Sequence, residues 1–92
     1  MVKVEASQAG DAWSCRVTVD FDGEHTEHQV AVSRQDLARW GRGAERAGVE
    51  DLVRRSFEFL LQREPPGSIL ESFELSVIPR YFPEYDRAIG RQ

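Results

Sequence analysis

The chain has 92 residues, of which 40% are hydrophobic and 30% charged, a balance that predicts one small globular domain and excludes a disordered chain. Twelve Lys and Arg against 16 Asp and Glu give a net charge of −4, which argues against a dedicated nucleic-acid binder because phosphate contacts need clustered cations. No apolar run approaches the roughly 20 residues of a membrane helix, and no signal-peptide core follows Met1. Cys15 is the single cysteine, which rules out an internal disulfide. We therefore expect a cytoplasmic protein without membrane association.

Residues 2–32 are predicted to form a three-stranded antiparallel β-meander. Between residues 13 and 21 apolar side chains alternate with polar ones, the period-two pattern of a half-buried strand. Asp22-Gly23 follows directly and is a strong hairpin signal, since both positions tolerate positive φ. Pairing across this turn sets Trp13 opposite Val32, Cys15 opposite Val30, Val17 opposite His28, Val19 opposite Thr26 and Asp20 opposite His25. One face of the hairpin is then mostly apolar, and a slip of one residue would mix the faces.

A first strand, from Val2 to Ser7, is predicted to return through a turn near Gly10-Asp11. Pairing through that turn places Val2, Val4 and Ala6 beside Val19, Val17 and Cys15, and a turn one residue earlier would keep the same faces. The resulting sheet has one apolar face, which the elements that follow are expected to cover.

A short helix is predicted to begin after Ser33, a natural N-cap with Asp36 three residues further on, and to run from Arg34 to about Trp40. Three glycines make the stretch 41–48 poor helix, although a continuous helix through it is the alternative.

The main helix is predicted over residues 49–63, where apolar residues recur at the spacing of one helix face. Pro65-Pro66 ends it, because proline lacks the backbone donor. The apolar arc is wide, with Phe59 and Leu61 at opposite margins. Such a helix can pack on the sheet and still contact a second partner.

Residues 68–75 are read as a short helix or turn, and residues 76–89 as an aromatic tail held by Pro79 and Pro83. Pro79 suits the first turn of a helix, and Pro83 ends that helix or begins another that reaches Ile89. We therefore expect one α+β domain, residues 1–92, with a β-meander over 2–32 and a helical part over 34–90 packed on one face of the sheet.

Neither a metal site nor a cofactor site is expected. The loop around Asp20, Asp22 and Gly23 matches only a fragment of a calcium-binding loop. His25 and His28 are three residues apart in a strand and therefore point to opposite faces, which does not suit zinc. The expected structure is a hairpin turn in which His25 pairs with Asp20 and His28 lies against the apolar face.

No catalytic residue is expected, and the protein is predicted to be non-enzymatic. Cys15 lies on the inward face of a strand, where thiols are usually inert, and no nucleophile elbow, phosphate loop or zincin pattern occurs. Glu71 and Glu74 could form a carboxylate pair beside Tyr81 or Tyr85, but solvated surface acids are the simpler interpretation.

Residues 26–63 resemble the ribbon-helix-helix repressors and antitoxins, in which a strand, a short helix, a glycine-bearing turn and a longer helix follow in this order. The resemblance implies that a strand from each of two chains enters the DNA major groove. Seven arginines lie in residues 34–63, so the alternative function is a DNA-binding regulator whose retention on DNA is salt-sensitive and weakened by Arg34→Glu or Arg39→Glu. The outward strand residues His25, Glu27 and Gln29 include no Arg or Lys, which departs from the family.

The stretches EDLV (50–53), SFEFLLQREP (56–65) and FELSVIPRYFPEY (73–85) resemble a family of short bacterial proteins to which no activity is assigned. The resemblance covers about half of the chain. Because no activity is assigned to that family, the resemblance implies a common family but no function.

The aromatic tail carries the best functional candidates. Aromatic residues and arginine concentrate binding energy at protein interfaces, so the candidate interface residues are Phe59, Arg80, Tyr81, Phe82, Tyr85 and Arg87. The alternative is that Val77, Ile78, Tyr81 and Phe82 complete the protein's own core. We expect a protein–protein interaction module that binds another protein or forms a homodimer through the helix margin at Phe59.

Overall fold

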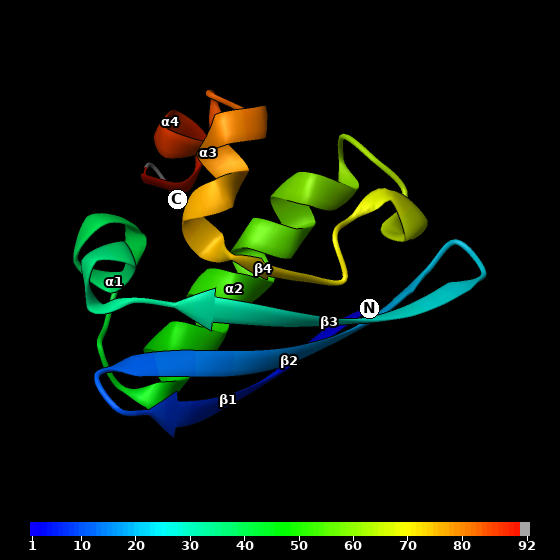
Figure 1. The fold of residues 1–92 in the computed structure, drawn as a ribbon. Helices are drawn as coiled ribbons and strands as arrows, with labels where there is room; N and C mark the ends of the chain where they lie inside the picture. Colours follow the sequence, from blue (N-terminus) through cyan, green and yellow to red (C-terminus); the bar gives the residue numbers. More distant parts are fainter. Residues whose placement is uncertain (91–92) are drawn as a thin grey trace.

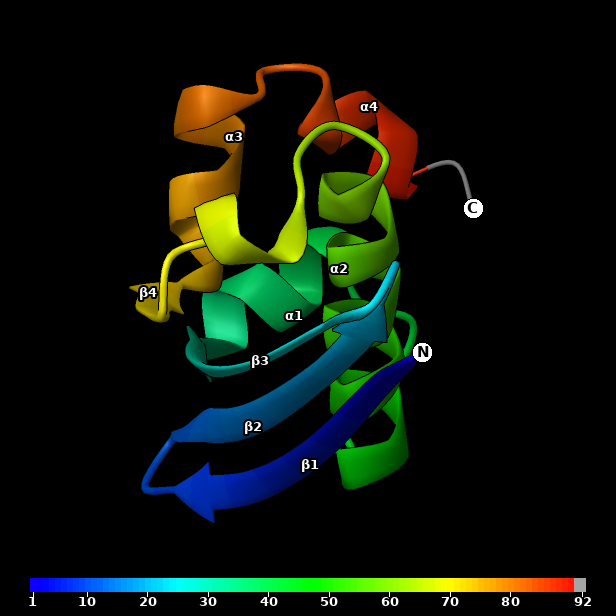
Figure 2. The same ribbon diagram turned by 90° about the vertical axis from the view of Figure 1, so that its right-hand side faces the viewer.

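The chain folds as an α+β domain in which the helices lie on one side of a four-stranded sheet (Figures 1 and 2), and this computed structural model describes residues 1–90. The strands are β1 (Val2–Ala9), β2 (Ala12–Phe21), β3 (Glu24–Val32) and β4 (Ser72–Glu74). The helices are α1 (Arg34–Trp40), α2 (Arg46–Leu61), α3 (Ile78–Tyr81) and α4 (Tyr85–Gly90), with 3₁₀ turns η1 (Pro66–Ser68) and η2 (Leu75–Val77). Within the described residues, no helix has the length and apolar character that crossing a membrane requires.

Strands β1, β2 and β3 pair in the predicted register. Cys15 of β2 lies between Ala6 of β1 and Val30 of β3, so one face of the sheet is apolar along its length. The β2–β3 turn forms because Asp22 and Gly23 both adopt positive φ, 57° and 83°. Only glycine takes such a conformation without strain, and Asp is among the few other residues that tolerate it.

The sheet is mixed, so the prediction of a three-stranded antiparallel meander is wrong in this respect. Residues 72–74, which were expected within a short helix or turn, form β4 and run parallel to β3 with Phe73 beside Val30. The Gln29 N–H donates to the Glu71 carbonyl at 2.8 Å and begins this pairing. A free strand edge favours the addition of another strand. Three residues are too few to carry a local sequence pattern that would predict such a strand.

Helix α1 has the predicted bounds, and its first turn is held by a reciprocal capping box. Ser33 Oγ accepts from the Asp36 N–H at 3.0 Å, and Asp36 Oδ2 accepts from the Ser33 N–H at 2.9 Å. Leu37 and Trp40 are buried, as predicted. The cap therefore fixes the angle at which the chain leaves the sheet.

Replacing Ser33 with alanine is expected to lower the free energy of unfolding by about 1 kcal/mol, because the Asp36 N–H loses its acceptor. Urea denaturation followed by tryptophan fluorescence measures this loss. Ser33→Asn keeps a side-chain acceptor and should recover most of it. An equal loss in both variants would contradict a capping role.

Helix α2 begins at Arg46, three residues before the predicted start, and ends at Leu61. Residues 41–45 between α1 and α2 are not helical, so the alternative of one continuous helix is wrong. Gly48, which was expected to weaken the helix, lies within its first turn. A Cβ there would lie 2.5 Å from the Gly43 carbonyl oxygen, so this glycine permits the linker to pack closely on the helix.

A single core joins the sheet, α2 and the C-terminal segment. Its buried residues are Ala6, Cys15, Val17, Val19, Val30, Val32, Leu37, Trp40, Val49, Leu52, Val53, Phe57, Phe59, Leu60, Ile69, Leu75, Ile78, Tyr85 and Ile89. One side of α2 faces the sheet and the other faces α4. At the end of α1, the Trp40 Nε1–H donates to Asp86 Oδ1 at 2.5 Å and ties α1 to α4.

The two edges of the sheet are closed to different extents. At β1, Glu50 of α2 accepts a hydrogen bond from the Ala6 N–H at 3.0 Å, and this bond holds the pKa of Glu50 below its usual value. At the other edge, β4 is only three residues long. Natural proteins protect sheet edges with short edge strands and with side chains that cover them. Because β4 covers only three residues of β3, the β4 edge of this sheet is the more open of the two.

Candidate functional site

The six predicted interface residues separate into a buried and a surface group. Phe59 is 5% exposed and Tyr85 is fully buried, and their rings meet edge to face with centroids 5.3 Å apart. The half-buried Phe82 also meets the Phe59 ring edge to face, with centroids 6.0 Å apart. The helix margin at Phe59 is therefore occupied by the chain's own C-terminal segment.

Tyr85 anchors that segment through a polar contact in the core. Its hydroxyl lies 2.7 Å from Ser56 Oγ, which in turn donates to the Leu52 carbonyl at 2.8 Å. Burial raises the pKa of Tyr85 to about 12. The phenol thus stays neutral and acts as a structural group.

The surface group consists of Arg80, Tyr81 and Arg87, of which Tyr81 is 69% exposed. Tyr81 is the last residue of α3, and Phe82 after it leaves the helical conformation with φ −130° and ψ 84°. This break turns the two tyrosines, which are four residues apart, to different sides of the segment.

The connection between η1 and β4 is held against the sheet by His28. Its Nδ1 lies 2.7 Å from the Leu70 carbonyl, and because a carbonyl only accepts, Nδ1 carries the proton. Its Nε2 lies 2.9 Å from Thr26 Oγ1, and the ring packs on Phe57 at 5.3 Å. The contact of His28 with the apolar face is as predicted, and its role in fixing Leu70 was not foreseen.

The chain is extended at Ile69, with φ −77° and ψ 135°, so neighbouring side chains point to opposite sides. Ile69 is 6% exposed and enters the core, whereas Leu70 is 50% exposed. The adjacent apolar pair was the available sequence signal: in an extended segment one of the two must face outward.

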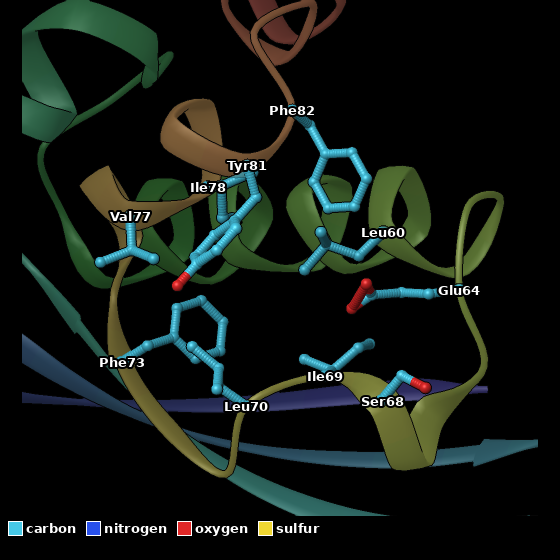
Figure 3. A pocket seen from close by; sticks show the side chains of 10 residues that line it. All are labelled: Leu60, Glu64, Ser68, Ile69, Leu70, Phe73, Val77, Ile78, Tyr81 and Phe82. Atoms are coloured by element: carbon cyan, nitrogen blue, oxygen red, sulfur yellow. The ribbon is translucent and has the colours of Figure 1, made fainter.

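An apolar groove of about 360 Å³ lies between the end of α2, the η1–β4 connection and α3 (Figure 3). Its lining residues are Leu60, Glu64, Ser68, Ile69, Leu70, Phe73, Val77, Ile78, Tyr81 and Phe82. A second hollow of about 500 Å³ lies beside it over β3 and β4. Leu70, Phe73, Val77 and Tyr81 border both, so the two hollows form one continuous surface with an apolar ridge between them.

Glu64 is the one ionisable carboxyl group among the groove residues. Figure 3 shows its carboxylate directed between Leu60 and Ile69, at the end of the groove opposite the Tyr81 hydroxyl. Partial burial among apolar groups raises the pKa of Glu64 above its usual value. No cationic side chain of residues 1–90 lies within 4 Å of this carboxylate.

The remaining candidates from the sequence lie apart from the groove or at its edge. Cys15 is fully buried, and burial and the nearby Glu50 raise its pKa to about 11, which suppresses the reactive thiolate. His25 is exposed and lies 2.6 Å from Asp20, as predicted. Glu74 borders the second hollow together with Tyr81. Within the described part of the chain, no three His, Cys, Asp or Glu side chains gather closely enough to hold a metal ion.

The arginine-rich part of the chain is largely paired with its own carboxylates. Five arginines of residues 34–63 contact acidic side chains, namely Arg39, Arg46, Arg54, Arg55 and Arg63. Strand β3 lies between β2 and β4. Residues 29–31 of β3 are therefore paired within the chain on both sides, which leaves only the rest of its outer edge for the intermolecular strand pairing that ribbon-helix-helix proteins use.

Comparisons with protein-family models, curated proteins and solved structures give no match for this chain. The resemblance of residues 50–85 to a family of short bacterial proteins therefore stays a prediction.

Proposed function

We propose that this protein is a protein–protein interaction module that receives an apolar segment of another protein in the groove and across the ridge of Leu70 and Tyr81. The observation that carries this proposal is the pairing of two exposed apolar side chains beside a preformed hollow. Four large apolar residues are exposed in the described chain, and Met1 and Phe21 lie elsewhere. Contiguous exposed apolar surface beside a hollow is typical of an interaction site.

The ridge and the groove together have the features of a small binding site. Tyrosine and leucine on the ridge offer apolar contact area, and the groove beside them can seat a partner side chain. The backbone of the ridge is held in place from below, since the Leu70 carbonyl is bound by His28. A site that is already ordered loses little conformational entropy when a partner binds.

Selection of phage-displayed random dodecapeptides on the immobilised protein tests this function. The wild type is expected to enrich apolar peptides. The double variant Leu70→Asp/Tyr81→Ser is expected to recover fewer peptides, by a factor of about ten or more, because two exposed contact residues are lost. Phe21→Ser at the hairpin tip is the control, since it removes an exposed apolar residue (41% exposed) that lines neither the groove nor the second hollow. Circular dichroism should be the same for all three proteins.

Equal recovery by the wild type and the double variant would overturn the proposal, as would the absence of enrichment on the wild type. Light scattering provides a second test. A mass of two chains that returns to one chain in the Leu70→Asp/Tyr81→Ser variant would assign the ridge to a homodimer instead.

A further inference from the structure

Glu64 occupies its place in the groove because the backbone fixes it there. The chain leaves α2 through Gln62, and the Glu64 N–H donates to the Leu60 carbonyl at 2.9 Å. Pro65 follows and restricts the backbone further. The side chain is turned into the groove between two apolar residues, where a carboxylate loses part of its hydration (Figure 3).

The cation next to Glu64 in the chain is engaged elsewhere. Arg63 binds Glu84 at 3.0 Å and the Phe59 carbonyl at 3.0 Å, and its guanidinium lies 3.6 Å from the centre of the Phe59 ring. Arg63 therefore serves the contact between α2 and the C-terminal segment. The carboxylate of Glu64 faces the groove without a partner among the described residues.

The sequence around the groove is acidic. Residues 64–79 contain Glu64, Glu71 and Glu74 and no Lys, Arg or His, and they are flanked by Arg63, which is paired with Glu84, and by the exposed Arg80. Glu71 and Glu74 are exposed, and Glu74 borders the second hollow. A negative potential along an apolar groove favours partners of positive charge.

We propose that Glu64 makes this groove selective for a basic apolar segment, whose Lys or Arg pairs with the Glu64 carboxylate while its apolar side chains contact Leu70 and Tyr81. This inference rests on the proposed function and names the chemistry of the partner. Charge also separates this partner from a second copy of the chain. A twofold contact through the groove would place the acidic surface with Glu64 and Glu74 of one copy against the same surface of the other, and like charges brought close together weaken an interface.

The test repeats the selection of random dodecapeptides on the wild type, on Glu64→Gln and on Glu71→Gln. Peptides from the wild type are expected to be enriched in Lys and Arg next to apolar residues. Glu64→Gln removes the charge and keeps the shape, so its binding to the same peptides should weaken about three- to fivefold, the range for a partly exposed ion pair. Glu71→Gln removes an exposed charge that lines neither the groove nor the second hollow and should have a smaller effect.

A second measurement shows that the variant stays folded. The desolvated carboxylate destabilises the free protein, so Glu64→Gln should raise the thermal midpoint while it weakens binding, and Glu71→Gln should leave the midpoint unchanged. Enrichment of apolar peptides without Lys or Arg, or equal binding by Glu64→Gln, would overturn this inference and leave the interaction function in place. The absence of any enrichment on the wild type would overturn both.

Discussion

Replacing Tyr85 with alanine is expected to lower the free energy of unfolding by about 3–5 kcal/mol, whereas Tyr81→Ala should lower it by less than about 0.5 kcal/mol. Tyr85 is fully buried and touches Phe59 and Trp40 with ring centroids 5.3 Å away in each case. Its removal leaves a cavity where the C-terminal segment meets α2. Tyr81 is 69% exposed, so its removal empties little of the core.

The hydroxyl of Tyr85 should account for a minor part of this loss. In Tyr85→Phe the ring remains and Ser56 Oγ keeps its bond to the Leu52 carbonyl, so we expect a loss of about 1 kcal/mol. Ser56→Ala leaves the Tyr85 hydroxyl without its partner in a dry site and should cost about 1–3 kcal/mol. The double variant Ser56→Ala/Tyr85→Phe should cost less than the sum, because neither polar group is then stranded.

Urea denaturation of these variants, followed by tryptophan fluorescence, measures the losses. The outcome divides the aromatic tail into structural and binding residues. Similar losses in Tyr85→Ala and Tyr81→Ala would contradict the burial difference on which the interaction surface depends. A stable Tyr85→Ala protein with altered molecular mass would return Tyr85 to the interface group.

The parts of the fold that were predicted correctly depend on signals between near neighbours in sequence. Asp22-Gly23 fixes a turn, the turn fixes the register, and the register decides that Cys15 and Val30 face the same side. Ser33 and Asp36 likewise contain the start of α1 within four residues. In each case one local geometry satisfies both the backbone and the hydrophobic pattern, so the sequence alone decides it.

The parts that were missed depend on contacts between distant residues. The strand β4 exists because Gln29 and Ala31 of β3 present an open edge more than 40 residues earlier in the chain. Tyr81 and Tyr85 have the spacing of one helix face, and only the break at Phe82 separates them. The groove was missed for the same reason, since Leu60, Leu70 and Tyr81 are distant in sequence and line it together only in the folded chain.

The arrangement of Glu64 joins stability to the proposed binding role. Burial of the carboxylate disfavours its charged form and so destabilises the free protein. No ion pair with a described residue compensates for this loss. Functional sites commonly retain such groups at the expense of stability. A bound cation would remove the cost, which links the affinity for a basic segment to a gain in stability.

Alkaline pH is expected to destabilise the protein between about pH 9 and pH 12, because two buried groups must stay protonated in the fold. Burial raises the pKa of the Cys15 thiol from 9.0 to about 11 and that of the Tyr85 phenol from 10.0 to about 12. Both groups are neutral when protonated, and the unfolded chain releases their protons at lower pH than the native state does. The free energy of unfolding is therefore full below pH 9 and falls as pH rises through these two ranges.

The expected loss is of the order of 2–3 kcal/mol for each group, since one unit of pKa corresponds to about 1.4 kcal/mol. Urea denaturation at intervals between about pH 8 and pH 12 measures the slope. Tyr85→Phe should flatten the upper part of the profile, and Cys15→Ala should flatten the lower part, although each variant begins from a lower stability. Equal slopes in the wild type and the Cys15→Ala/Tyr85→Phe double variant would show that these two groups do not govern the alkaline transition.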